Sequence, residues 1–349
     1  MTGPALLSLA TAVPLHVVDQ DEAAERAAVL FAGRVFRTPD LMSIFANTGI
    51  RTRRTAQPMD WYATPHEWPE RNAVYLAAAE ALFIESAEKA LAAAELRADE
   101  IGTVVTVSST GIATPSLEAR LFSRMGFSPS VHRVPVFGLG CAGGVSGLSI
   151  ASRLASADPG RPVLLVVVEL CSLSCRPDEF TKANVVATAL FGDGAAAMVL
   201  CAGQSDLRTV EAVGEHIWPE TLDIMGWRID PVGFGVILSS DLPNFVTRRM
   251  REAGETTFRE MGVTAADVSR FAFHPGGARV LPAVESSLDL PLGALDVERA
   301  VLADYGNMSA PTVFFVLERL LAREEPGRLM LGALGPGFTA TFVSLAAAA

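Results

Sequence analysis

Short apolar runs alternate with longer stretches of helical character along most of the chain. Runs of strand length occupy residues 5–10, 102–108, 163–169 and 195–202. Several of these runs are near-continuous Val and Leu without polar alternation, which is typical of strands that are covered on both faces. The alternation of such strands with helices predicts mixed α/β layers.

Three segments between the strands have helical character. Residues 72–96 are rich in alanine and keep their charged positions on one side, residues 116–125 follow, and residues 311–323 form an amphipathic stretch. Residues 31–69 mix Arg, Pro and Trp without a regular period. We therefore expect a loop-rich excursion there, near an opening of the structure.

The second half of the chain reads as a variation on the first. Its strand-type runs cover residues 270–273, 328–334 and 339–345. A turn of glycine and other small residues leads into a buried helix twice, once at Cys141 and once at Asn307. This repetition predicts two similar α/β halves, residues 1–205 and 206–349, with no flexible linker between them.

Composition and charge limit the class of protein. With 349 residues, of which 50% are hydrophobic and 19% are charged, the chain can bury a large core. A net charge of −11 argues against nucleic acid as a partner, because proteins that bind it present a basic footprint. No apolar run reaches the ~18 residues of a membrane span, and no basic residue precedes the first apolar segment as in a secretory signal.

The cysteines give no sign of a metal site. Cys141, Cys171, Cys175 and Cys201 do not follow zinc-ligand spacing, and the five histidines are scattered. We therefore expect no bound metal. Free thiols in a chain without an evident signal favour the reducing cytoplasm.

Cys141 lies in a turn of small residues between a strand-like run and a buried helical segment. The free N–H groups and the positive dipole end of a helix N-terminus favour a thiolate there. The neighbouring glycines let a ligand approach closely. An ordinary buried cysteine is the alternative interpretation of this segment alone.

Two further residues supply the other parts of a covalent acyl-transfer site. His274 ends a strand and precedes Pro-Gly-Gly, at a sheet edge where α/β proteins usually meet their ligands, although a solvated loop histidine fits as well. Asn307 follows Gly306 at the start of a helix, where Asn is also common as an N-cap. Cys, His and an amide donor together make a nucleophile, a proton carrier and an oxyanion donor. The local signature of papain-like proteases is absent around Cys141.

A series of short motifs makes the chain resemble the type III polyketide synthases, relatives of plant chalcone and stilbene synthases. The motifs are residues 7–14, 138–144, 190–196, 273–277, 305–310 and 335–339. They occur in the family's order and span nearly the whole chain. His-Pro-Gly-Gly in particular separates this family from the ketoacyl-ACP synthase III enzymes, which typically carry His-Gln-Ala-Asn. The resemblance implies a thiolase-like fold of two similar halves in α-β-α-β-α layers.

The resemblance also implies a mechanism. Cys141 accepts an acyl starter from a coenzyme A thioester, while His274 and Asn307 hold the carbonyl and stabilise the enolate that forms when malonyl-CoA loses carbon dioxide. Repeated extension and cyclisation follow, with no cofactor and with acyl-CoA and malonyl-CoA as substrates. A homodimer is implied as well. Phe191 lies where the family has a phenylalanine that gates the passage from the coenzyme A tunnel, although a core aromatic before a turn is the alternative.

Departures from the plant enzymes indicate a reshaped cavity. The positions that we expect to line it are Ser109, Ser174, Cys175, Trp227, Phe234 and Val236. Most of these residues are smaller than their plant counterparts, which favours a tunnel-like cavity, a long-chain acyl starter and alkylpyrone or alkylresorcinol products. Trp227 opposes this trend, because it fills space where plant enzymes have a small residue.

The coenzyme A phosphates need local positive charge on this acidic protein. The basic residues that serve plant members are not matched, since Ser43 and Asn47 lie at two of those positions. The candidates that remain are Arg51, Arg53, Arg54 and Arg279. A solvated hairpin would explain the arginine run equally well.

Two other functions compete with the polyketide synthase. An enzyme like ketoacyl-ACP synthase III would condense only once and stop. A catalytically silent thiolase-fold subunit would serve as a partner, but the intact set of Cys141, His274 and Asn307 argues against it.

Overall fold

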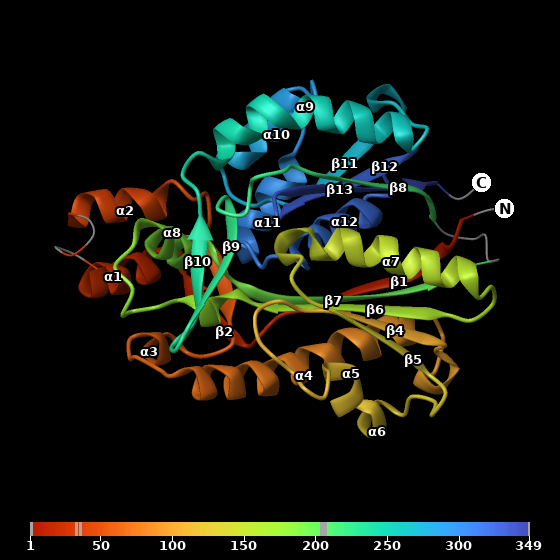
Figure 1. Cartoon of the computed structure of the whole chain (residues 1–349), viewed down its shortest axis with the longest axis horizontal. Helices are drawn as coiled ribbons and strands as arrows, with labels where there is room; N and C mark the ends of the chain where they lie inside the picture. The colour runs from red at the N-terminus through yellow and green to blue at the C-terminus, as the bar shows by residue number, and fades with distance from the viewer. Residues whose placement is uncertain (1–2, 32–33, 35–36, 203–207, 348–349) are drawn as a thin grey trace.

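The computed structural model describes residues 3–31, 34, 37–202 and 208–347. Nine of the strands in these residues form one sheet in the order β11-β12-β13-β8-β1-β7-β6-β4-β5 (Figure 1). Their bounds are β1 Ala5–Ala12, β4 Thr103–Val107, β5 His132–Val136, β6 Val163–Leu170, β7 Asp193–Cys201, β8 Thr209–Ile217, β11 Arg270–Phe273, β12 Leu329–Gly335 and β13 Thr339–Ala346. The predicted apolar runs coincide with strands of this sheet, whereas β8 was not predicted.

The sheet repeats one pairing scheme in two halves. In the first half β1 pairs antiparallel with β7, β7 antiparallel with β6, and β6 parallel with β4. In the second half β8, β13, β12 and β11 pair in the same way, and β5 extends the first half by one strand. The halves meet where Ala5 of β1 pairs with Thr209 of β8. The boundary predicted between residues 205 and 206 lies outside the described residues.

Helices lie on the outside of both halves and between them (Figure 1). Helix α4 (Trp68–Ala93) covers the outer face of the first half, and α9 (Leu242–Glu260) with α10 (Val280–Ser287) covers that of the second. Helices α7 (Gly143–Ala157) and α12 (Thr312–Ala322) lie between the two halves and share one hydrophobic core. The layered α/β fold predicted from the sequence is therefore confirmed.

Small residues let the two central helices approach each other closely. A Cβ on Gly144 would lie 2.3 Å from the carbonyl oxygen of Ala310, and one on Gly143 would lie 3.4 Å from the Cβ of Ala310. Any larger side chain at Gly144 would push the helix starts apart. This close approach brings the segment of Cys141 beside the segment of Asn307.

The remaining elements are shorter. The helices are α1 Gln20–Phe31, α2 Thr38–Ala46, α3 Met59–Tyr62, α5 Leu117–Arg120, α6 Phe122–Met125, α8 Lys182–Leu190 and α11 Asp296–Tyr305. The strands are β2 His16–Asp19 with β3 Thr52–Thr55, and the hairpin of β9 Met225–Asp230 with β10 Gly233–Leu238. The helix expected over residues 116–125 is divided into α5 and α6.

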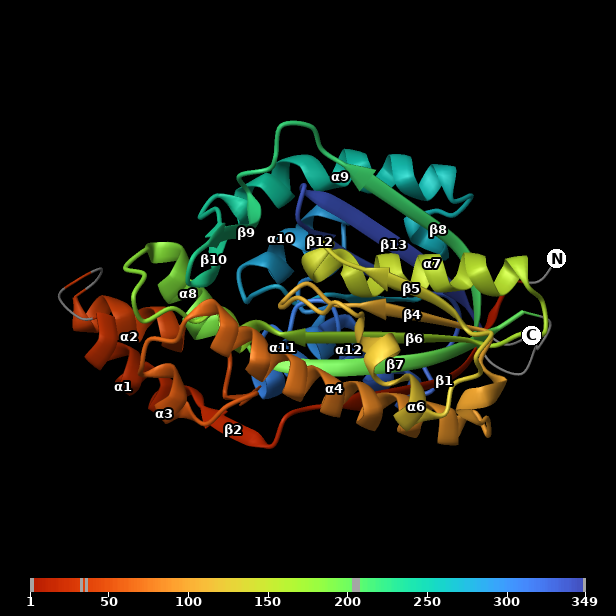
Figure 2. The ribbon, with the colours of Figure 1, turned by 60° about the horizontal axis from the view of Figure 1, so that its bottom comes forward.

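The expectation of a loop-rich region over residues 31–69 is wrong. Helix α2, strand β3, helix α3 and the start of α4 fall in it. Leu41 and Phe45 of α2 are fully buried and pack in one cluster with Phe31 and with Val185 of α8. Helices α1, α2, α3 and α8 together build one end of the molecule (Figure 2). The few apolar side chains of these short elements are buried by residues that are distant in sequence.

Candidate active site

Cys141 lies in a single 3₁₀ turn, Gly140–Ala142, that leads directly into α7. Gly140 has a φ of +47°, in the region that favours glycine. A Cβ on Gly140 would lie 2.7 Å from the Pro336 ring, so the loop between β12 and β13 packs onto this turn. The sulfur is thus held where the two halves of the fold meet.

The side chain of Asn307 is fixed by two hydrogen bonds. Its Nδ2 donates to the carbonyl oxygen of Gly276 over 3.0 Å, and the backbone N–H of Ser309 donates to its Oδ1 over 2.8 Å. These bonds define the amide orientation and leave the second N–H of Nδ2 for a ligand. Gly276 belongs to the turn that follows His274, so the amide also ties Asn307 to the histidine segment.

His274 extends from the end of β11, where its backbone N–H donates to Gly332 of β12 over 2.8 Å. The side chain is 3% exposed, and neither ring nitrogen has a hydrogen-bond partner among the described residues. A buried imidazole without a partner is costly, because both nitrogens lose their water. The ring is therefore available to a substrate oxygen or to the Cys141 proton.

Cys141, His274 and Asn307 line one cavity of about 70 Å³. The sequence places these residues far apart, and the fold gathers them. Glu169, Ser309, Phe191 and Trp227 complete part of its wall. The three candidate catalytic residues predicted from the sequence thus line one space, which we call the catalytic cavity.

Burial dominates the electrostatics of this cavity. It raises the pKa of the Cys141 thiol to about 11, against the opposing hydrogen bonds of Ser309 and Asn307. It lowers the pKa of His274 to about 3. The buried surroundings of both groups thus favour a neutral thiol and a neutral imidazole. A thiolate can form when the imidazole accepts the proton.

Glu169 is a site residue that the sequence analysis did not single out. Its Oε2 accepts the backbone N–H of Ser109 over 2.9 Å, while its Oε1 has no partner among the described residues. Burial raises the pKa of this carboxyl to about 8. The available signal was an acidic residue within the otherwise apolar strand Val163–Leu170.

Phe191 and Trp227 form an aromatic wall of the cavity. Their ring centroids lie 6.4 Å apart in an edge-to-face arrangement. The indole N–H of Trp227 donates to the carbonyl oxygen of Ser109 over 2.9 Å, which fixes the ring. The expectation that Trp227 fills cavity space agrees with its position in the wall.

Three of the predicted cavity residues lie elsewhere. Ser109 and Val236 line the catalytic cavity as expected. Phe234 precedes Val236 by two residues on its strand and stacks on the Trp227 ring, with the ring centroids 5.7 Å apart. Ser174 turns inward because its hydroxyl donates to the Cys171 carbonyl over 2.7 Å. Cys175 faces a different chamber.

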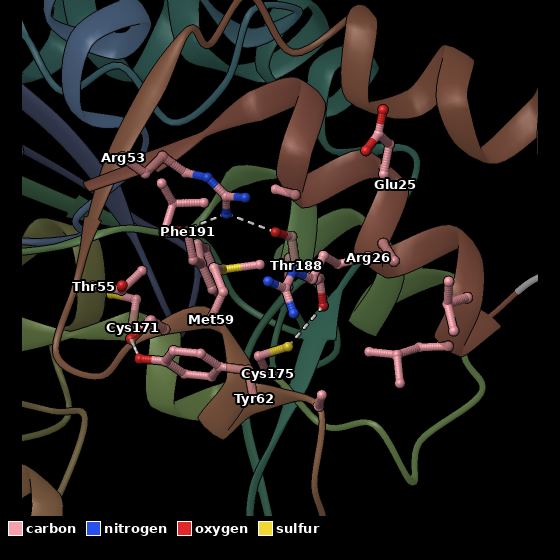
Figure 3. A pocket seen from close by; sticks show the side chains of 18 residues that line it. Glu25, Arg26, Arg53, Thr55, Met59, Tyr62, Cys171, Cys175, Thr188 and Phe191 are labelled. Carbon is pink, nitrogen blue, oxygen red and sulfur yellow. Dashed lines mark hydrogen bonds between the residues drawn. The ribbon is translucent and has the colours of Figure 1, made fainter. Parts of the chain in front are cut away.

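That second space, the rear chamber, has a volume of about 320 Å³ (Figure 3). Residues of α1, β3, α3 and α8 line it, together with Cys175, Cys171 and Phe191. Cys171 and Phe191 also line the catalytic cavity, so the two spaces share a wall. The larger space therefore adjoins the nucleophile but is formed by the part of the chain that was expected to be loops.

The arginines expected to bind coenzyme A have different environments. Arg51 forms an ion pair with Asp304, and Arg54 is half-buried on β3. Arg53 is buried and points into the rear chamber, so it cannot bind a phosphate at the surface (Figure 3). Arg279 is exposed at the start of α10, next to the His274 turn.

Residues 3–31, 34, 37–202 and 208–347 contain neither a candidate metal-binding cluster nor a candidate membrane-spanning helix. No group of three or more His, Cys, Asp and Glu side chains in this part of the chain is arranged to hold a metal ion. No helix there is both long and apolar enough to cross a membrane.

Known proteins match this chain over most of its length. The N-terminal domain of chalcone and stilbene synthases matches residues 60–204, and their C-terminal domain matches residues 209–344. The chain belongs to the chalcone and stilbene synthase family. It is a type III polyketide synthase, an acyltransferase that acts by decarboxylative Claisen condensation.

Individual relatives agree with this assignment. A 1,3,6,8-tetrahydroxynaphthalene synthase of Streptomyces peucetius subsp. caesius is 39% identical over 98% of this chain and 93% of its own. An alpha-pyrone synthesis polyketide synthase-like protein of Mycobacterium tuberculosis is 31% identical over 95% of this chain and 88% of its own. The crystal structure of the 1,3,6,8-tetrahydroxynaphthalene synthase of Streptomyces coelicolor, 31% identical, superimposes with a TM-score of 0.93 and covers 99% of both chains.

Proposed function

We propose that this type III polyketide synthase loads an acyl group from an acyl-CoA onto Cys141 and extends it repeatedly with malonyl-CoA. In the loading step the Cys141 sulfur bonds to the acyl carbon, and coenzyme A leaves as a thiol. His274 takes the Cys141 proton and returns it to the leaving sulfur. The observation that carries this proposal is the convergence of Cys141, His274 and Asn307 on one cavity.

The extension step uses the same cavity. Malonyl-CoA loses carbon dioxide, and the electron pair of the broken C–C bond forms an enolate. The free N–H of Asn307 and the imidazole of His274 stabilise the enolate oxygen. The enolate carbon attacks the acyl carbon on Cys141, and the sulfur leaves as a thiolate. Because the departing carboxylate supplies the carbanion, the reaction requires no metal or prosthetic group.

The rear chamber supports a long acyl starter. The catalytic cavity of about 70 Å³ is too small for an extended chain, whereas the rear chamber of about 320 Å³ adjoins it across Cys171 and Phe191. For comparison, a cavity of ~150 Å³ accommodates a benzene molecule. The chamber is lined mainly by apolar groups, including Leu30, Met59 and Ala187. Long-chain starters would give alkylpyrones or alkylresorcinols.

Mass spectrometry of products from a panel of acyl-CoA starters, from two to sixteen carbons, tests this function. We expect products that carry two or more added ketide units, with higher turnover for starters that reach the rear chamber. Products with a single added unit would instead support an enzyme like ketoacyl-ACP synthase III. Absence of product with every starter would contradict the proposal.

The first half of the sheet ends in an edge that suits a homodimer. Strand β5 is the outermost strand, and most of its residues are exposed or half-exposed. The following Phe137 is 54% exposed. An open strand edge flanked by an apolar side chain favours pairing with a second copy.

We assign the enzyme to the cytoplasm on the basis of its four free thiols.

A further inference from the structure

Arg53 lines the rear chamber and donates a hydrogen bond to the backbone of Phe191, a residue that lines both the rear chamber and the catalytic cavity. We propose that Arg53 is a positioning residue that holds the gate residue Phe191 and the oxyanion residue Asn307 in register, and so sets the efficiency of condensation. This inference rests on the function proposed above. Arg53 lies on strand β3, beside the segments that carry these two residues. We call residues 188–192 the gate segment and residues 305–307 the oxyanion segment.

The guanidinium group binds the gate segment directly. Its Nη1 donates to the carbonyl oxygen of Phe191 over 2.8 Å and to that of Thr188 over 2.6 Å (Figure 3). Both acceptors lie at the end of α8, where the chain turns into the gate. These bonds fix the backbone from which the Phe191 ring projects.

The aliphatic stem of Arg53 packs on the other segment. Gly306 precedes Asn307 and has a φ of +70°. A Cβ on Gly306 would lie 2.8 Å from the Cγ of Arg53, so only glycine lets the two chains approach this closely. One side chain thus contacts the gate with its head and the oxyanion segment with its stem.

The gate and oxyanion segments are also bonded to each other. The backbone N–H of Asn307 donates to Leu190 over 2.8 Å, and the N–H of Gly192 donates to Asn307 over 3.0 Å. These two bonds flank Phe191. A shift of the gate backbone therefore moves the backbone of Asn307, and Arg53 limits that shift from both sides.

Arg53 is buried at a considerable desolvation cost. It is 5% exposed, burial lowers its pKa to about 10, and its Nε has no partner among the described residues. Asp193 is nearby and partly offsets this cost. The hydrogen bonds that Arg53 donates to Thr188 and Phe191 also offset this cost, and its side chain lines the chamber in which the acyl tail would lie.

A matched pair of substitutions tests this role. Arg53→Met removes the bonds to the gate, while Arg71→Met serves as the control. Arg71 is 3% exposed and donates to the carbonyl oxygens of His66, Leu173 and Cys175, but it lines neither cavity. Both variants are expected to lower the melting temperature, because each loses buried hydrogen bonds.

The readouts are kcat and KM for condensation, the rate of malonyl-CoA decarboxylation, and the product chain lengths. We expect Arg53→Met to lower kcat for condensation about 10- to 100-fold, as small misplacements of reacting groups do. The KM for malonyl-CoA should change less than about twofold, decarboxylation per condensation should rise, and products should shorten. Arg71→Met should keep the wild-type ratio of decarboxylation to condensation and the wild-type product chain lengths.

The outcomes separate this inference from the proposed function. If the wild type is active and Arg53→Met gives the same product pattern as Arg71→Met, the role of Arg53 is overturned and the proposed function stands. A wild type that makes no polyketide overturns both. If Arg53→Met does not fold, Arg53→Lys, which keeps one donor group, is measured in its place. A kcat for condensation below that of the wild type, with shorter products, supports the role, and an unchanged kcat and product pattern contradicts it.

Discussion

At the scale of single residues, the catalytic cavity is defined by buried polar groups that find no hydrogen-bond partner in the part of the chain that the structure describes. These groups are both ring nitrogens of His274 and one carboxyl oxygen of Glu169. Such groups lower stability unless a ligand or a proton satisfies them. The sequence identified Cys141, His274 and Asn307 because their local motifs are distinctive. Glu169 was not identified, because its burial depends on neighbouring strands rather than on local pattern.

The carboxyl of Glu169 makes a specific prediction for stability against pH. Burial raises its pKa from 4.5 to about 8, so the folded protein holds a proton that the unfolded chain releases between these values. Stability from this group is therefore present below pH 4.5 and is lost as the pH rises towards 8. The loss amounts to about 5 kcal/mol at ~1.4 kcal/mol per pKa unit.

Urea unfolding at pH 6 to 9 measures this effect in wild type and in Glu169→Gln. The amide stays neutral and keeps an acceptor for the Ser109 N–H, so the variant should lose less stability than wild type as the pH rises. Glu298, whose pKa burial raises to about 7, leaves some pH dependence in both proteins. The exposed control Glu88→Gln should behave as wild type. Parallel curves for wild type and Glu169→Gln would show that Glu169 is ionised in the folded protein.

At the scale of elements, continuous apolar strands were predictable and short mixed elements were not. Strands such as Val163–Leu170 are buried on both faces, so their sequence alone specifies their environment. Helix α2 and strand β3 are short, and their apolar positions are too few to show a period. Helix α2 is ordered by contacts with α1 and α8, and strand β3 by contacts with β2, β7 and α11, which no local pattern reveals.

The open edge at β5 makes a prediction about assembly. Phe137→Glu places a charge beside that edge, and we expect it to shift a dimer towards monomer at micromolar concentration, because an unpaired charge in an interface is costly. Light scattering after size-exclusion chromatography measures the mass. Leu292→Glu is the matched control, since Leu292 is equally apolar and 87% exposed but precedes α11. A monomeric wild type, or a dimeric Phe137→Glu, would contradict the assignment of β5 to the interface.

At the scale of the whole molecule, the reaction space is assembled from both halves of the fold. The first half supplies Cys141 from the start of α7, and the second supplies His274 and Asn307 from the end of β11 and the start of α12. The repeat of a small-residue turn before a buried helix predicted the two similar halves, and the fold then brings the two turns together. The rear chamber could not be predicted, because its walls come from four short elements whose packing depends on the complete fold.

The most direct measurement compares decarboxylation with condensation in Cys141→Ala, with Cys201→Ala as the control thiol in β7. Loss of the sulfur should abolish polyketide formation, while His274 and Asn307 should still support release of carbon dioxide from malonyl-CoA. Radiolabelled malonyl-CoA follows both products in one assay. Polyketide formation by Cys141→Ala at the wild-type rate would show that the acyl chain is carried elsewhere.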